Sequence, residues 1–240
     1  MFNLVTINLD KKLSFVSVVF MLLSLIVTHM IIIFNASFDV SDFNLYNEFD
    51  LFQENYILET IQLIELIEVI FIILLVELEL FHNTDNFDSY FVSIYRKKMF
   101  FVSKIISYLI IIFFYTTVIF IQFSVVYLLR FQTIQHVNLL LNLYLNYLIY
   151  FSVIFLVAFL FMLIFKNYFS AMIVFLYYWI GKLIEENNEL FNVIFPQISF
   201  DFSTNKSTFG TEILYILTLI VVMFFISSKI FEFKDMKVNS

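Results

Sequence analysis

The sequence predicts an all-α fold, a polytopic membrane helix bundle with six transmembrane helices in one domain covering residues 1–240. Of the 240 residues, 62% are apolar and only 14% are charged, far from the balance of a soluble domain. The chain holds 35 Phe and 14 Tyr but only 2 Gly and 1 Pro, which favours long uninterrupted elements. Backbone groups inside a bilayer must bond within the protein, so solid apolar runs are expected to be helices.

Each expected helix follows one apolar run. The first covers Leu13 to Phe38, contains no Asp, Glu, Lys or Arg, and exceeds the roughly 20 residues that cross a bilayer. A signal peptide is the rival interpretation, but its apolar region would span only about 7–15 residues. The remaining helices are expected at about 57–80, 105–129, within 131–165, at 168–184 and at 211–228.

The basic residues are distributed unequally between the two sides of this threading. Of the 13 Lys and Arg residues, only Arg130, Lys182 and Lys206 fall on the side opposite the termini. The positive-inside rule therefore predicts that both termini are cytoplasmic. The expected cytoplasmic segments are 1–12, 82–103 and 229–240, and the expected external segments are 40–55 and 186–208. The external region of about 185–210 mixes charged with apolar residues, which predicts partly buried structure.

Motifs for catalysis or cofactor binding are missing from the sequence. Gly181 and Gly210 lie too far apart to form a phosphate-binding loop, so we expect no nucleotide site in this chain. There is no Cys for a thiolate metal site, and His29, His82 and His136 stand on three different segments. We therefore predict no catalytic, cofactor-binding or metal-binding residues, and no nucleic-acid partner.

A short amphipathic helix is expected in the segment of about 83–98. Four apolar residues recur at i, i+3, i+4 and i+7 and so share one face, namely Phe87, Tyr90, Phe91 and Ile94. Arg96 and Lys97 follow at its C-terminal end, where positive charge is favourable. This helix either lies on the lipid surface or inserts its aromatic face into a cytoplasmic partner.

The same region resembles the membrane subunits of ABC-2 type ATP-binding-cassette transporters, also termed type V exporters. In that family a glutamate closes the second helix, a coupling helix follows, and a basic turn with a downstream lysine opens the third helix. In this sequence the closing glutamate corresponds to Glu79. The basic turn corresponds to Ser93-Ile94-Tyr95-Arg96-Lys97-Lys98, and the downstream lysine to Lys104. The resemblance extends to the tight turn at Lys166-Asn167 and the Phe195-Pro196 segment before the last helix.

The resemblance implies a permease subunit of a bacterial cell-membrane exporter, without enzymatic activity of its own. It implies a separate ATPase subunit that carries ATP and Mg, a second permease copy or paralogue, and contact with membrane lipid. The coupling residues would be Phe87, Tyr90, Phe91, Ile94, Arg96 and Lys97. The substrate would be apolar or amphipathic, such as a peptide, since the chain looks most like small peptide-export or bacteriocin-immunity permeases. Two alternatives stay open: a non-transporting accessory or immunity protein, and a proton-coupled secondary transporter that uses Glu65 and Glu68.

Glu65 and Glu68 are expected near the middle of the second helix, about 60° apart on one face, with Gln62 extending the polar stripe. Acids at the centre of a membrane helix are costly and usually face a bundle interior or a wet cavity. We expect no basic residue of this chain at that depth. The hypothesis is that Gln62, Glu65 and Glu68 line a translocation cavity between subunits and bind cationic groups of the substrate or of the partner permease. The alternative is that both glutamates lie in external water.

Overall fold

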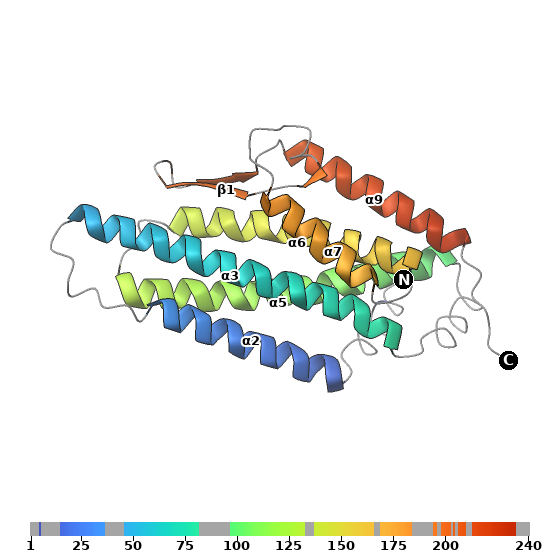
Figure 1. Cartoon of the computed structure of the whole chain (residues 1–240), viewed down its shortest axis with the longest axis horizontal. Helices are drawn as coiled ribbons and strands as arrows, with labels where there is room; N and C mark the ends of the chain where they lie inside the picture. The colour runs from blue at the N-terminus through green and yellow to red at the C-terminus, as the bar shows by residue number, and fades with distance from the viewer. Residues whose placement is uncertain are drawn as a thin grey trace.

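The computed structural model describes residues 5, 15–36, 46–81, 97–132, 137–165, 169–183, 194–195, 198–202, 204, 206–209 and 213–233. These residues form six long helices and one short hairpin (Figure 1). The helices are α2 (Phe15–Ala36), α3 (Tyr46–Phe81), α5 (Lys97–Phe131), α6 (Val137–Phe165), α7 (Phe169–Leu183) and α9 (Ile213–Phe233). The strands are β1 (Ile198–Asp201) and β2 (Lys206–Phe209).

The six helices occupy the regions that the apolar runs predicted, but α3 and α5 begin much earlier, and α9 ends at Phe233 rather than near residue 228. α3 begins at Tyr46 rather than near residue 57, and α5 begins at Lys97 rather than near residue 105. The hydropathy criterion stops at charged residues because charge is costly in hydrocarbon. A helix can extend beyond the hydrocarbon layer, where charged residues are no longer costly. The predicted helices were therefore too short.

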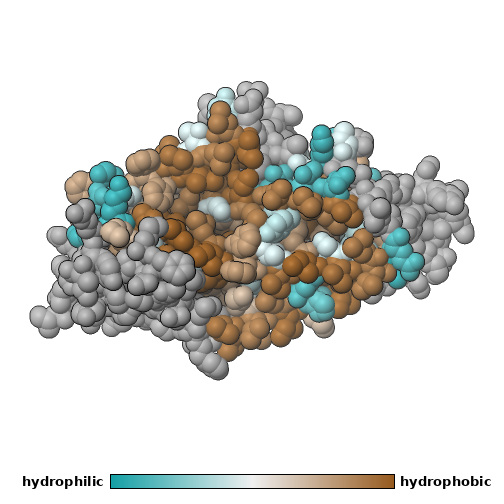
Figure 2. Space-filling model, turned by 180° about the vertical axis from the view of Figure 1, so that it is seen from behind, coloured by the Kyte–Doolittle hydropathy of each residue, from teal (hydrophilic) through white to brown (hydrophobic). Residues whose placement is uncertain are grey.

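Four of the described helices are long and apolar enough to span a membrane, which indicates a membrane-embedded protein. They are α2, α5, α6 and α9. α3 is long enough but carries several acids, and α7 has only 15 residues. Large apolar side chains cover much of the described outer surface, seen as brown in Figure 2. Such a surface suits lipid rather than water.

Consecutive helices run in opposite directions around α6 (Figure 1). α6 is the central helix: 67% of its apolar 18-residue stretch is buried, against 11% for the span Val18–Asn35 of α2 and 17% for the corresponding stretch of α9. The end of α3, the start of α5 and the end of α9 gather at one end of the bundle. There Lys97 Nζ donates to the Glu232 carbonyl at 3.4 Å. The predicted cytoplasmic segments 82–103 and 229–240 are therefore continuous in sequence with helix ends that lie at one end of the bundle.

Aromatic rings fill the interior between α5, α6 and α9. Tyr108 of α5 lies 5.1 Å from Phe155 and 6.0 Å from Phe159 of α6, measured between ring centroids. Phe101 contacts the same Phe159 and also Phe224 of α9. Helices in lipid gain little from moving apolar groups away from water, so close packing of this kind supplies much of their association.

The β1–β2 hairpin covers part of α6. The strands are antiparallel, and Ile198 pairs with Phe209 at their open end. Asn146 of α6 donates from Nδ2 to the Ser207 carbonyl at 2.8 Å and to Ser207 Oγ at 3.0 Å. This anchor holds β2 against α6, in a region where the sequence predicted partly buried structure but no strand.

Candidate functional site

Three acidic side chains of α3 are buried in the bundle. Glu65 is 3% exposed, Glu68 is fully buried, and Glu77 is 5% exposed. Since α3 packs against α2, α5, α6 and α7, several of its faces point into protein rather than lipid. A buried acid is costly unless it is paired, hydrogen-bonded or protonated, so the partners of each carboxyl group define what the site can do.

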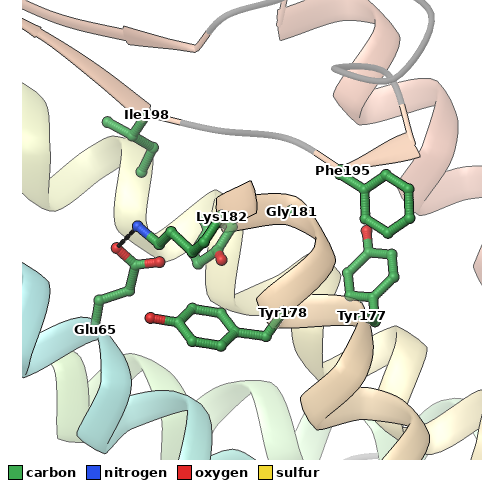
Figure 3. A pocket seen from close by; sticks show the side chains of 8 residues that line it. Glu65, Tyr177, Tyr178, Gly181, Lys182, Phe195 and Ile198 are labelled. Atoms are coloured by element: carbon green, nitrogen blue, oxygen red, sulfur yellow. Dashed lines mark hydrogen bonds and ion pairs between the residues drawn. The ribbon is translucent and has the colours of Figure 1, made fainter. Parts of the chain in front are cut away.

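Glu65 is paired with a cation from α7 (Figure 3). Lys182 Nζ lies 2.8 Å from Glu65 Oε2, and the Tyr147 hydroxyl donates to the same oxygen at 2.9 Å. Both interactions are charge-assisted hydrogen bonds, which are stronger than neutral ones. The Lys182 side chain is 41% exposed, so one partner of this pair stays in contact with the outside while the other is enclosed.

The expectation that no basic residue would reach these glutamates was wrong. α7 ends at Leu183, close to the middle of α3, where Glu65 lies about 28 Å from Tyr46 along the helix. Lys182 is in the last turn of α7. Its four-carbon stem lets the ammonium extend from the helix end to the buried carboxylate.

Glu68 has a different environment from Glu65. Thr116 Oγ1 of α5 donates to Glu68 Oε2 at 3.0 Å. The second oxygen, Oε1, is buried and has no hydrogen-bond partner among the residues that the structure describes. Lone carboxylates are strongly disfavoured in a dry interior, so an uncharged carboxylic acid fits this position better than an anion.

The other acid and the predicted polar stripe also have clear positions. Ser170 Oγ of α7 donates to Glu77 Oε1 at 2.8 Å, which makes a second polar link between α3 and α7. Gln62 is exposed on the outside of α3. Its side chain therefore does not join Glu65 and Glu68 in the interior of the chain.

A partly enclosed cavity lies beside the Glu65–Lys182 pair. Aromatic side chains form much of its wall: Tyr150 of α6, Tyr177 and Tyr178 of α7, and Phe195. Ile198 at the start of β1 and Gly181 complete the lining. Its volume of about 20 Å³ holds about one water molecule, far below the hundreds of Å³ of a pocket for a drug-sized ligand. The site is filled by its own side chains in this state.

Two contacts fix the aromatic wall. Lys182 Nζ lies 5.9 Å from the centroid of the Tyr178 ring, within the range of a cation–π interaction. The Tyr177 hydroxyl donates to the Ile194 carbonyl, and the Tyr177 and Phe195 rings are 4.9 Å apart. The residues just before the hairpin are thereby held against α7 over the cavity.

Most of the predicted coupling residues lie outside the described residues. These are Phe87, Tyr90, Phe91, Ile94 and Arg96. Lys97 is the first residue of α5 and contacts the end of α9 through the Glu232 carbonyl. The side chain of Glu79, near the end of α3, is likewise outside the described part. The coupling role stays a prediction.

Chemically, the site provides a carboxylate, several aromatic faces and a partly exposed ammonium. Within the described ranges no group of three His, Asp or Glu side chains could hold a metal ion. Sequence reasoning missed Tyr147, Tyr150, Tyr178 and Lys182 as members of this site. One signal for them exists: Tyr178 and Lys182 are spaced i, i+4, which places them on one face at the end of a helix.

Searches against protein-family models, curated proteins and solved structures found no match to this chain, so its function has to be argued from its own residues.

Proposed function

We propose that this chain is the membrane-spanning permease subunit of an ABC-2 type exporter in a bacterial cell membrane. In this proposal all six helices cross the bilayer, both termini are cytoplasmic, and a separate ATPase drives transport. A second permease, identical or paralogous, completes the complex. The substrate is an apolar or amphipathic molecule such as a peptide.

The observation that carries the proposal is the pair of buried carboxyl groups, Glu65 and Glu68, in a bundle with an apolar exterior. Ionisable groups inside the membrane are expensive, and they generally mark substrate or ion pathways. A protein that only occupied the membrane would be more stable with apolar residues at these positions.

The order of elements supports the ABC-2 assignment. Six helices alternate in direction, a tight connection joins α6 to α7, and β1 and β2 lie between α7 and α9. The basic run Arg96-Lys97-Lys98 leads into α5, where the resemblance places the basic turn after the coupling helix. The short connection between α6 and α7 and the basic run before α5 match the family pattern of the sequence resemblance.

The experiment is ATP-dependent uptake into inside-out membrane vesicles. The chain is co-expressed with a candidate ATPase subunit, and uptake of a fluorescent amphipathic peptide is measured with and without ATP. We expect uptake to require ATP and an ATPase that can hydrolyse it. Uptake that follows a pH gradient without ATP would instead support the proton-coupled transporter. This alternative is favoured by the Glu68 oxygen that has no hydrogen-bond partner among the described residues.

The coupling segment gives a matched pair of variants for the same experiment. Phe91→Asp places a charge on the predicted apolar face, so it should abolish co-purification of the ATPase. Ser89→Asp adds the same charge on the opposite face of the predicted helix and should leave the complex intact. If both variants retained the ATPase, the segment would lie on lipid and the coupling role would be wrong.

A further inference from the structure

We propose that Glu65 and the aromatic residues around it form a cage for an organic ammonium group, and that Lys182 occupies this cage when no ligand is present. The inference rests on the proposed function, because the ligand would be the cationic part of an exported molecule. It specifies a class of cargo: amphipathic molecules that carry a primary or quaternary ammonium.

The wall of the cavity has the chemistry of a cation site. Aromatic faces attract ammonium ions through the negative potential above the ring, and cages of several aromatic rings recognise alkylated ammonium groups. Tyr150, Tyr177, Tyr178 and Phe195 supply four rings here, and Glu65 supplies the countercharge. Figure 3 shows the Lys182 ammonium at the Glu65 carboxylate, with the Tyr178 ring on the same side of the Lys182 stem as Glu65.

The position of Lys182 indicates that it can leave. Its side chain is 41% exposed, whereas Glu65 is only 3% exposed. The ammonium could move toward the open side and be hydrated there, since lysine has a flexible stem and a strongly hydrated head, provided that the ligand's cation replaces it beside Glu65. Glu65 would then remain in the cage beside the Tyr147 hydroxyl, ready to accept another cation.

Glu68 does not qualify as a second cage of this kind. Its one described hydrogen bond comes from Thr116, and it is absent from the lining of the cavity at Glu65. The proposal therefore assigns different roles to two acids that are three residues apart.

The test uses the purified full chain and n-butylammonium, which has the size and charge of the lysine side-chain end. Lys182→Ala removes the internal competitor, namely the three outer carbons and the ammonium of the side chain, and so leaves most of the space that n-butylammonium needs. A tethered side chain competes at an effective concentration in the millimolar range, so Lys182→Ala should bind n-butylammonium at least about threefold more tightly than the wild type. Binding is read from the rise in the thermal midpoint with ligand concentration.

Three controls accompany this measurement. Neutral 1-butanol should give no comparable rise in Lys182→Ala, and Lys182→Met, which fills the space without charge, should not respond to n-butylammonium. Lys182→Ala combined with Glu65→Gln should also lose the response. If Lys182→Ala bound no ammonium, or if the double variant bound it equally well, the cage would be refuted.

A second measurement covers the case in which Lys182→Ala does not fold. In the wild type, tetramethylammonium should displace Lys182 from Glu65 and raise the labelling of Lys182 by an amine-reactive reagent, measured by mass spectrometry. Lys229, whose side chain is 66% exposed, serves as the internal reference and should not change. Unchanged Lys182 labelling at saturating tetramethylammonium would overturn the proposal.

Neither measurement involves the ATPase, so the two proposals can fail separately. Ammonium binding without ATP-dependent uptake would keep the cage and reject the exporter. Uptake of the peptide without ammonium binding would keep the exporter and reject the cage.

Discussion

Glu65 and Glu68 lie one turn apart on α3, and both are buried, but their neighbours differ. Glu65 accepts hydrogen bonds from the Lys182 ammonium and the Tyr147 hydroxyl, and it borders a cavity. Glu68 accepts one hydrogen bond, from the Thr116 hydroxyl, and its other oxygen has no partner in the described part of the chain. The difference teaches that depth on a helix does not decide the charge of an acid. The groups that the neighbouring helices supply decide it: Glu65 has a cation as a partner, and the described partner of Glu68 is a neutral hydroxyl.

The largest effect is expected for Lys182→Met. This change leaves a buried carboxylate at Glu65 without its cation, and breaking a buried ion pair in this way costs about 3–5 kcal/mol. The partial exposure of Lys182 favours the lower end, so the thermal midpoint in detergent should fall by about 6–12 °C at a fixed heating rate. Lys229→Met removes the exposed pair with Glu232 and should cost less than about 1 kcal/mol. Equal losses in the two variants would mean that the Glu65 pair is no more than a surface contact.

A smaller effect is expected for Thr116→Val. The substitution preserves shape but removes the hydroxyl that donates to Glu68, and a buried polar group without a partner costs about 1–3 kcal/mol. The matched control is Thr218→Val on α9, where the hydroxyl is exposed and donates to the Leu214 carbonyl of its own helix. A midpoint for Thr116→Val as high as that of the control would show that Glu68 has another partner.

The smallest effect is expected for Glu68→Gln. If Glu68 is a neutral acid, the amide replaces it with another neutral group of the same shape, and stability should change by less than about 1 kcal/mol. Glu65→Gln should cost more, because an ionised acceptor of Lys182 is lost. The thermal midpoints of the two variants test this order directly. The reverse order would mean that Glu68 carries the charge.

Local patterns in the sequence predicted the helices well. The apolar runs at 13–38 and 211–228 correspond to α2 at Phe15–Ala36 and α9 at Ile213–Phe233, because hydropathy is a property of neighbouring residues. The burial of Glu65 and Glu68 was also anticipated, since membrane acids are too costly to face lipid.

The partner of Glu65 could not be predicted in the same way. Lys182 is 117 residues away along the chain, and its contact depends on how α7 packs against α3. Counting charges by side assigned Lys182 to the exterior, since the count follows the backbone and takes no account of the reach of a side chain. The contact of Asn146 with Ser207 is similar, because nothing near Asn146 in sequence indicates a strand beside it.

The lengths of α3 and α5 have a consequence for the molecule outside the membrane. With 36 and 35 residues, these helices are about 54 and 52 Å long, whereas the hydrocarbon layer is about 30 Å thick. Membrane helices tilt by at most about 40°, and at that angle α3 would still cover about 41 Å. In the proposed topology, in which α3 also crosses the bilayer, both helices would extend beyond the lipid tails. The first part of α3 carries Glu54 and Glu59, so an extension at this end would place negative charge where it can concentrate cations from solution.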